Sequence, residues 1–292
     1  MLNIVHDGQG QMCNKLLFLA QILASGYHRN FKVNYYNFHK YEGIAYDNPN
    51  LNKIFNGIEE PHKYEKLIAA VSKISMKLPR KKLPKILRIN VKKEAEILEK
   101  YFAADYFSKQ DLWWYGWPYM DYVSLRENVE LLRDFFRFTP EIDKIAEANL
   151  EHENYDRVYG IHMRRGDYKE WLGGKYYFSD QVYERIMKEI AELEKNKKIK
   201  IILFSNEPIS LSDGVCNENV EIVCSENSAM IDLCMLSKCD CLIGPPSTFS
   251  GWASFVGNKK RFVLDFAEKS FDLKRSYVWL TETDGWGIPL DE

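Results

Sequence analysis

The sequence lacks the features that place a protein in a membrane or outside the cell. It has no run of roughly 18 apolar residues, the length that a membrane-spanning helix requires. Its first residues have neither the basic start nor the apolar stretch of a secretory signal peptide. Six cysteines in 292 residues are also too few for a disulfide framework. We therefore expect a cytoplasmic protein whose cysteines are reduced.

The spacing of the cysteines also argues against a zinc site. Cys234, Cys239 and Cys241 lack the Cys-x2-Cys spacing of common zinc sites, and no histidine lies near them in the sequence. Cysteine is among the residue types that are most often buried. We therefore interpret these three side chains as small members of a core and expect no bound metal.

A strong net charge is absent as well. The 40 basic residues nearly balance 42 acidic ones, which argues against a dedicated nucleic-acid binder. The balance is uneven along the chain, because residues 66–93 contain ten Lys or Arg and no Asp or Glu. Apolar residues interleave with these cations, and this pattern favours peripheral contact with an anionic surface at the inner face of the cytoplasmic membrane. A solvated basic face is the alternative interpretation, and nucleic acid is the weakest one.

Alternating strands and helices predict an α/β fold. The chain opens with an apolar strand at residues 2–5, a helix at 14–27 and a second strand at 31–38. A similar alternation starts again at residue 157. At this length two domains are expected, so we predict two Rossmann-like lobes of parallel sheet that face each other. We place the first lobe at residues 1–152, the second at 153–268, and a tail at 269–292 that packs back on the first lobe.

The second half gives the clearest element boundaries. We predict strands at residues 157–163, 199–204, 220–224, 241–243 and 261–264, and helices at 125–137, 140–150, 179–194, 229–237 and 252–256. Residues 113–122 are dense in Trp and Tyr. Such a cluster is typical of a core, and stacking on sugar rings is the functional alternative.

Three motifs of the second half follow predicted strands, where open α/β sheets bind ligands. They are His162-Met-Arg-Arg-Gly-Asp-Tyr168, Phe204-Ser205-Asn206, and Ser247-Thr248-Phe249-Ser250. Guanidinium groups pair well with phosphate, and hydroxyls at a helix N-terminus suit an anion. Each motif alone is more typical of an ordinary surface, cap or core. Their joint placement predicts a pyrophosphate site that uses no Gly-rich Walker loop.

A dinucleotide-dependent oxidoreductase is the generic alternative for a strand–loop–helix opening. Residues 6–13 do not complete the Gly-x-Gly-x-x-Gly fingerprint, because Cys13 stands at the third glycine position. No suitable acidic residue follows about 20 positions later, as that fingerprint requires. We therefore set this class aside.

The motif from His162 to Tyr168 resembles the His-x-Arg-Arg-Gly-Asp-Tyr signature of the α-1,2-fucosyltransferases, glycosyltransferase family 11. The resemblance continues in family order through most of the second half, with Tyr176-Tyr177, Phe204-Ser-Asn, Asp232 and Ser247-Thr-Phe-Ser-Gly-Trp252. The loop from Gly10 to Leu16 is similar to the Gly-x-x-Gly-Asn-Arg/Gln-Leu loop of these enzymes, with Cys13-Asn14 in place of Gly-Asn.

This resemblance implies a GT-B fold and inverting transfer of L-fucose from GDP-β-L-fucose. It implies that Arg164 holds the β-phosphate, that His162 contributes to nucleotide binding and that Asp232 pairs with guanine. The remaining donor-binding residues that it implies are Arg165, Ser205, Ser247, Thr248, Ser250, Gly10 and Asn14.

The reaction chemistry agrees with arginine in place of a metal ion. A departing diphosphate needs positive charge, and no two aspartates in this chain have the Asp-x-Asp spacing that holds a divalent metal. We therefore expect a metal-independent enzyme with Arg164 as the stabilising cation. Asp167 is the first choice for the general base, with Glu170 and Asp7 as alternatives. Asp167 has a second possible role, which is to orient Arg164 or the arginine beside it.

The expected function is thus transfer of fucose, in α-1,2 linkage, to a surface polysaccharide or lipopolysaccharide unit that is lipid-linked. The second lobe would bind the GDP-sugar donor and the first the glycan acceptor. Two alternatives remain open, which are a relative that uses another GDP-sugar or linkage and a nucleotide-binding relative that has lost catalysis.

Overall fold

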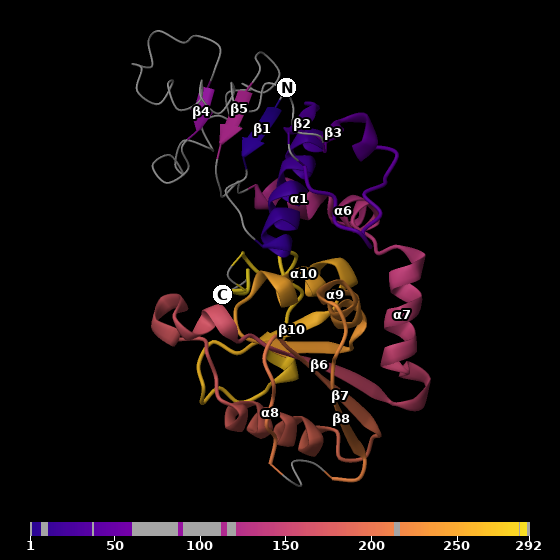
Figure 1. Cartoon of the computed structure of the whole chain (residues 1–292), viewed down its shortest axis with the longest axis vertical. Helices are drawn as coiled ribbons and strands as arrows, with labels where there is room; N and C mark the ends of the chain where they lie inside the picture. Colours follow the sequence, from indigo (N-terminus) through magenta and orange to yellow (C-terminus); the bar gives the residue numbers. More distant parts are fainter. Residues whose placement is uncertain are drawn as a thin grey trace. The chain divides into compact units, whose positions relative to one another are not determined.

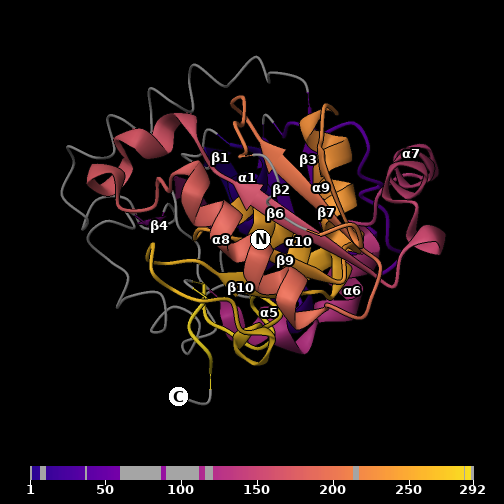
Figure 2. The ribbon, with the colours of Figure 1, turned by 90° about the horizontal axis from the view of Figure 1, so that it is seen from below.

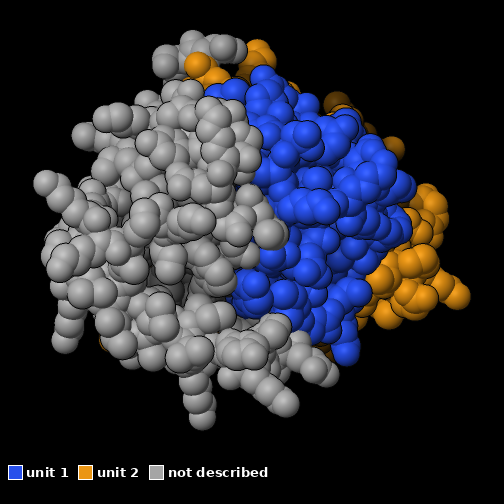
Figure 3. All heavy atoms as spheres, turned by 90° about the horizontal axis from the view of Figure 1, so that it is seen from above, with its two compact units in different colours: residues 1–137 blue, residues 138–292 orange. Residues whose placement is uncertain are grey.

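The structure is a computed structural model that describes residues 2–6, 11–36, 38–59, 87–89, 112–115, 121–212, 217–285 and 287–290. The chain divides into two compact units, residues 1–137 and residues 138–292, which are coloured separately in Figure 3. Each unit contains a five-stranded sheet in which every described pairing is parallel. The α/β class expected from the sequence is confirmed.

The boundary between the units differs from the expected one. It lies after residue 137 rather than after 152, because helix α7 (Pro140–Leu150) belongs to the second unit. There α7 packs against helix α9 (Ala229–Lys238), and Lys238 Nζ forms ion pairs with Asp143 at 3.2 Å and Glu147 at 3.1 Å. Periodicity identified α7 as a helix, but it carries no information about which sheet a connecting helix packs on.

The C-terminal tail also differs from the expectation. Residues 269–292 are part of the second unit rather than a separate segment on the first. Tyr277 joins the edge of the second sheet, where its backbone exchanges hydrogen bonds of 2.9 and 3.1 Å with Arg261 in an antiparallel bridge. Trp279 packs directly over Gly251, where an added Cβ would lie 2.8 Å from the indole ring. The tail therefore contributes to the walls of the second unit.

The sheet of the first unit has the strand order β3-β2-β1-β5-β4. Its strands are β1 (Leu2–His6), β2 (Val33–Tyr36), β3 (Phe55–Ile58), β4 (Leu87–Ile89) and β5 (Leu112–Tyr115). Helix α1 (Met12–His28) is apolar around most of its circumference, so nearly all of its middle turns are buried. It packs against helices α5 (Tyr122–Glu127) and α6 (Val129–Phe135). A short 3-10 helix, η1 (Leu51–Lys53), precedes β3.

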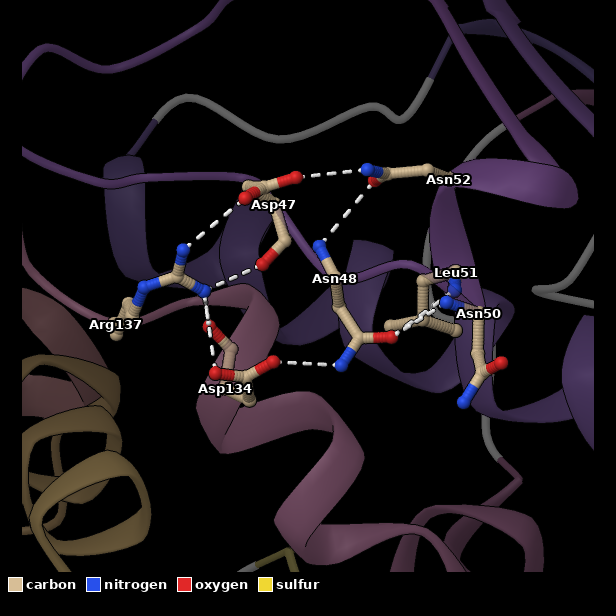
Figure 4. A network of polar contacts seen from close by, with 7 residues as sticks. All are labelled: Asp47, Asn48, Asn50, Leu51, Asn52, Asp134 and Arg137. Carbon is tan, nitrogen blue, oxygen red and sulfur yellow. Dashed lines mark hydrogen bonds and ion pairs between the residues drawn. The ribbon is translucent and has the colours of Figure 1, made fainter.

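The helix expected at residues 125–137 is two helices, α5 and α6, that meet at Asn128. Asp121 caps α5, since its carboxylate accepts a hydrogen bond of 3.1 Å from the Ser124 backbone N–H. At the end of α6 a polar network ties Arg137 and Asp134 to the loop at residues 47–52 (Figure 4). This network closes the first unit immediately before the boundary.

The sheet of the second unit has the order β10-β9-β6-β7-β8, and Figure 2 shows its first four strands side by side. The strands are β6 (Arg157–Met163), β7 (Ile199–Ser205), β8 (Val220–Cys224), β9 (Cys241–Gly244) and β10 (Lys260–Val263). Helix α8 (Asp180–Leu193) covers one face, and α9 and α10 (Thr248–Gly257) cover the other (Figure 1). Short 3-10 helices complete the unit at His152–Asn154 (η3), Gly166–Lys169 (η4), Trp171–Gly174 (η5) and Leu273–Arg275 (η6).

Buried apolar side chains from α8 and from β6, β7, β9 and β10 form one core on the α8 face of this sheet, and partly buried side chains of β8 pack against it. The elements predicted from the second half of the sequence are confirmed within a few residues, except that α10 begins at Thr248, four residues earlier than expected. This earlier start places the Ser-Thr-Phe-Ser motif at the first turn of a helix. The three strand-end motifs therefore lie along the carboxyl edge of the sheet.

Several expectations concern segments that are mostly outside the described residues. Of the basic segment 66–93, only 87–89 is described, as strand β4, and of the aromatic segment 113–122 the structure describes residues 113–115 in β5 and 121–122 at the start of α5. Cys13, Cys224, Cys234, Cys239 and Cys241 are all free thiols, and all but Cys224 are buried. Among the described helices, none is both long and apolar enough to cross a bilayer.

Candidate active site

The signature motif begins in the last two residues of β6 and continues into the turn after it, and its basic side chains have different surroundings. His162 is the penultimate residue of β6, and Arg164 follows the strand end directly. Arg165 is the N-cap of η4. Strand β6 lies between β9 and β7, so the motif follows a central strand of the sheet.

His162 is a buried, neutral histidine. Burial, together with the nearby charges of Arg164 and Arg261, lowers the pKa of His162 to about 3. Its ring packs against Phe249 at a centroid distance of 5.2 Å, and its Nδ1 has no hydrogen-bond partner among the described residues. Gly244 on β9 allows this close packing, because a Cβ there would lie 2.6 Å from the carbonyl oxygen of His162.

Arg164 is oriented by the turn that follows it. Its guanidinium forms an ion pair of 2.8 Å with Asp167 and lies 5.3 Å from the centre of the Tyr168 ring. The Tyr168 hydroxyl donates a hydrogen bond of 2.6 Å to the carbonyl of Pro246, in the loop before α10. The side chain of Arg164 retains 17% exposure. Asp167 and Tyr168 therefore position the cation, which still reaches solvent.

Arg165 has different partners from those of Arg164. Its guanidinium pairs with Asp180 at the start of α8 and lies over the rings of Tyr177 and Tyr183. The side chain is only 6% exposed. This arrangement gives Arg165 a clear structural role, in which it ties the signature loop to α8. Its donor-binding role stays a prediction.

Two residues after β7 hold the backbone of the signature loop. Asn206, the last residue of the predicted Phe204-Ser205-Asn206 motif, accepts through Oδ1 a hydrogen bond of 3.0 Å from the Arg165 N–H. Glu207, which the sequence analysis did not identify, accepts through Oε1 a hydrogen bond of 3.1 Å from the Gly166 N–H. Lys169 also pairs with Glu207 at 3.1 Å, and this contact holds the pKa of the Glu207 carboxyl below its usual range. No sequence signal identifies Glu207, because its role depends on β7 lying beside β6.

Helix α10 directs its N-terminus towards this edge of the sheet. Ser247 is the N-cap, and its hydroxyl accepts a hydrogen bond of 3.3 Å from the Phe249 N–H. Thr248 is the first helical residue, and Ser250 in the same turn is fully buried with no hydrogen-bond partner for its hydroxyl among the described residues. A helix N-terminus carries partial positive charge and free N–H groups, so this turn is suited to an anion.

Arg261 on β10 is a second buried cation that the sequence analysis missed. It is 4% exposed, and one guanidinium nitrogen donates a hydrogen bond of 2.8 Å to the carbonyl of Pro245. Among the described residues no carboxylate pairs with it, and burial lowers the pKa of Arg261 to about 10. The sequence gives little signal for this role, because Arg261 directly follows two lysines, Lys259 and Lys260. Its charge acts on His162 together with that of Arg164.

Asp232 and Ser205 lie towards the other end of the same sheet. Asp232 is in the first turn of α9, half-buried, and burial raises its pKa to about 6. The Ser225 hydroxyl, just after β8, donates a hydrogen bond of 2.5 Å to Asp232. Ser205 ends β7 and donates a hydrogen bond of 2.8 Å to the Glu207 carbonyl. This region therefore offers hydrogen-bonding groups rather than cations.

The remaining candidate residues are not brought to this cluster by the described structure. Gly10 and Asp7 are outside the described residues. Asn14 is in the first turn of α1, in the first unit. Glu170 is exposed after η4. Within the described part of the chain, no three His, Cys, Asp or Glu side chains gather as ligands for a metal ion.

Together these groups are suited to an anion at one part of the sheet edge. Two cations, Arg164 and Arg261, flank a neutral His162 beside the N-terminus of α10. Fixed positive charge in a partly buried site stabilises negative charge more strongly than it does in water. The half-buried carboxyl of Asp232 lies further along the same edge, after β8.

Comparison with known proteins shows the family. The sequence profile of "Glycosyl transferase family 11" matches residues 28–273. A search of curated protein sequences finds no match.

Among solved structures, a mutant of FUT1 from Arabidopsis thaliana in complex with GDP is 12% identical with a TM-score of 0.58, over 94% of this chain and 71% of that one. NodZ alpha-1,6-fucosyltransferase soaked with GDP-fucose is 17% identical with a TM-score of 0.52, over 94% and 96%. POFUT1 in complex with GDP-fucose is 12% identical with a TM-score of 0.51, over 92% and 95%.

These structural likenesses confirm the GT-B-like α/β fold, and the profile match covers most of the chain. The resemblance inferred from the signature motif is therefore confirmed, and the chain belongs to glycosyl transferase family 11.

Proposed function

We propose that this protein transfers L-fucose from GDP-β-L-fucose to a sugar hydroxyl, with inversion and in α-1,2 linkage. The observation that carries the proposal is the convergence of Arg164, Arg261 and the N-terminus of α10 around neutral His162. A departing GDP develops negative charge on its β-phosphate, and these groups provide positive potential at that place. Structurally similar proteins crystallised with GDP or GDP-fucose support the choice of donor.

In this proposal each described residue has a separate task. Arg164 contacts the β-phosphate, and Asp167 is a positioning residue that holds the guanidinium through its 2.8 Å ion pair. Arg261 adds a second positive charge from β10. His162 stays neutral, so its unpartnered Nδ1 is able to hydrogen-bond the nucleotide without adding charge. The Asp232 carboxylate accepts hydrogen bonds from guanine.

The reaction in this proposal proceeds without a metal ion, because the two arginines supply the positive charge that a divalent cation would otherwise supply. The candidates for the general base remain Asp167, Glu170 and Asp7. Asp167 is engaged with Arg164, whereas Glu170 is exposed and follows the same turn. Asp167→Asn and Glu170→Gln, assayed separately, distinguish these two residues. Full activity in both variants would remove this loop as the source of the base.

The donor is tested by thermal shift with GDP, UDP, ADP, GDP-fucose, GDP-mannose and NAD, each in the presence of EDTA. The GDP compounds alone should stabilise the protein, by on the order of 2 kcal/mol at tens of Kd. Stabilisation by UDP or NAD instead would overturn the donor assignment. A strict requirement for added Mg²⁺ or Mn²⁺ in turnover would overturn the metal-independent reaction.

The acceptor and linkage are tested by product analysis. We propose a surface polysaccharide or lipopolysaccharide unit as the acceptor, with the basic segment 66–93 contacting the anionic membrane that carries it. NMR of the product should show fucose attached through an α-1,2 bond. An α-1,6 bond would refute the linkage and leave the donor unaffected. Co-sedimentation that does not distinguish anionic from neutral liposomes would refute the membrane contact.

A further inference from the structure

A pocket of about 530 Å³ lies within the second unit, beside the candidate active site. Its walls come from the loop after η4, the carboxyl end of β10 and the C-terminal segment that packs against that strand. Its volume is within the range of sites that bind small molecules. The side chains used below are Trp171, Tyr176, Arg261, Asp265, Lys269 and Arg275.

Stacked aromatic rings form one wall of this pocket. Trp171 stacks on Tyr176 at a centroid distance of 5.5 Å and on Tyr168 at 4.7 Å, in both cases with the planes within 36°. Trp171 is nevertheless 38% exposed, although a large aromatic side chain gains from burial. The C–H face of a sugar ring covers such a surface while its hydroxyls remain free for hydrogen bonds. This wall is therefore suited to a pyranose ring.

The polar lining of the pocket has an excess of positive charge. Lys269 and Asp265 form an ion pair of 2.9 Å and offset each other. Arg261 has no carboxylate partner among the described residues. Arg275 is 76% exposed, and its ion pair with Asp272 is long, at 3.8 Å, so its charge is only partly offset. Arginine forms its strongest hydrogen bonds with carboxylate and phosphate groups. The lining therefore favours a ligand with an anionic group.

The pocket adjoins the anion site described above. Arg261 belongs to both, because it lines the pocket and its charge lowers the pKa of His162. Pro246 also lines the pocket, and its carbonyl accepts the hydrogen bond from Tyr168, whose ring lies beside Arg164. A molecule in the pocket would therefore lie next to the place where the proposed leaving group departs.

We propose that this pocket binds a saccharide that carries a carboxylate or phosphate group, with its ring on Trp171 and its anionic group towards Arg275 and Arg261. Binding by itself is independent of the proposed function. The role of this saccharide as part of the acceptor rests on the proposed fucosyl transfer.

Ligand-observed NMR tests the binding with three probes, glucuronic acid, glucose 6-phosphate and glucose, each added to the full chain first without GDP and then with saturating GDP. The two anionic probes should bind at least about fivefold more tightly than glucose, as expected for a charge-assisted contact. A preference for only one of them identifies the anionic group. Equal binding of all three probes, or displacement of the anionic probes by GDP, would overturn the proposal.

Matched variants test the location of the site. Trp171→Ala should weaken the binding of all three probes. Tyr27→Ala, at an exposed aromatic residue of the first unit, should leave the binding of all three unchanged. Arg275→Gln should weaken the binding of the two anionic probes only. Lys274→Gln removes a neighbouring charge that does not line the pocket, so it should leave the binding of all three probes unchanged. Unchanged probe binding in Trp171→Ala or Arg275→Gln would overturn the assignment.

GDP binding measured on the same samples separates this proposal from the proposed function. If GDP binds and the anionic probes do not, the pocket assignment fails alone. If the probes bind and GDP does not, the donor assignment fails and the pocket remains as a saccharide site.

Discussion

Each unit has an arginine in contact with buried polar groups, and the two arginines have different surroundings. In the first unit Arg29 pairs with Asp121, a carboxylate whose side chain is 4% exposed, and Ser25 and Ser124 complete the network. In the second unit Arg261 is 4% exposed and is bonded to a backbone carbonyl, with no carboxylate partner among the described residues. A neutralised cation stabilises a fold, whereas a cation left without a counter-charge is available to an anionic ligand.

The largest expected effect concerns the cation nearest to the reaction. Arg164→Ala should reduce kcat for fucosyl transfer by roughly 10²–10³-fold, because the developing charge on the diphosphate loses its main stabilising group. Arg157→Ala is the matched control, since Arg157 begins the same strand at its opposite end and is 44% exposed. Initial rates with GDP-fucose measure both. A kcat near the wild-type value in Arg164→Ala would refute the role assigned to Arg164.

Substitution of Arg29 and of Arg261 should change stability in opposite directions. Arg29→Gln leaves Asp121 buried without its cation, so the free energy of unfolding should fall by about 3 kcal/mol. Arg261→Met removes a buried charge that has no carboxylate partner among the described residues, so the free energy of unfolding should stay the same or rise. GDP binding in that variant should weaken roughly tenfold or more.

Urea unfolding without ligand and calorimetric titration with GDP measure these effects. If Arg261→Met loses as much stability as Arg29→Gln, then Arg261 is a structural residue, and the contrast between the units disappears.

The neutral state of His162 should appear as a pH dependence of stability. Its pKa is about 3 in the fold and about 6.5 when unfolded. Between these values the unfolded chain binds the extra proton, so stability is present above pH 6.5 and falls as the pH decreases. From about pH 7 to about pH 5 the wild type should lose about 2 kcal/mol more than His162→Gln. Parallel pH profiles for the two proteins would contradict this prediction.

The smallest expected effect concerns Asp232, where the pKa is raised to about 6 by burial. A protonated carboxyl accepts fewer hydrogen bonds from guanine, so GDP should bind about tenfold more weakly at about pH 5 than at neutral pH. Asp232→Asn should retain only the pH dependence of the phosphate groups. As the pH falls below about 6, the wild type should gain stability relative to Asp232→Asn, because the folded state binds the proton of Asp232 more tightly than the unfolded chain does. This trend is opposite to the loss of stability that the wild type should show relative to His162→Gln.

The parts of the site that were predictable from sequence are those whose residues are close together in the chain. The stretch from His162 to Tyr168 is continuous, so residue types and spacing were enough to identify it. The strands and helices of the second unit were also clear, because their apolar periodicity is regular. Strand β3 and the break at Asn128 were missed, since a four-residue strand and an interrupted helix give weak periodic signals.

The residues that were missed depend on the order of strands in the sheet. Arg261 reaches His162 because β10 and β9 follow β6 at the sheet edge, and Glu207 reaches Gly166 because β7 lies on its other side. Arg165 has different partners from Arg164 because Asp180 and Tyr183 lie on α8, close to the Arg165 side chain. Spacing along the chain does not contain this information.

Gly244 adds a criterion for recognising this site in other sequences. A side chain at this position would collide with the backbone of His162, so β6 and β9 would have to separate. A related chain with the full signature motif and a larger residue here would therefore present its histidine differently. The glycine that ends β9 is therefore a position to compare in related sequences alongside the arginines, although it contributes no functional group of its own.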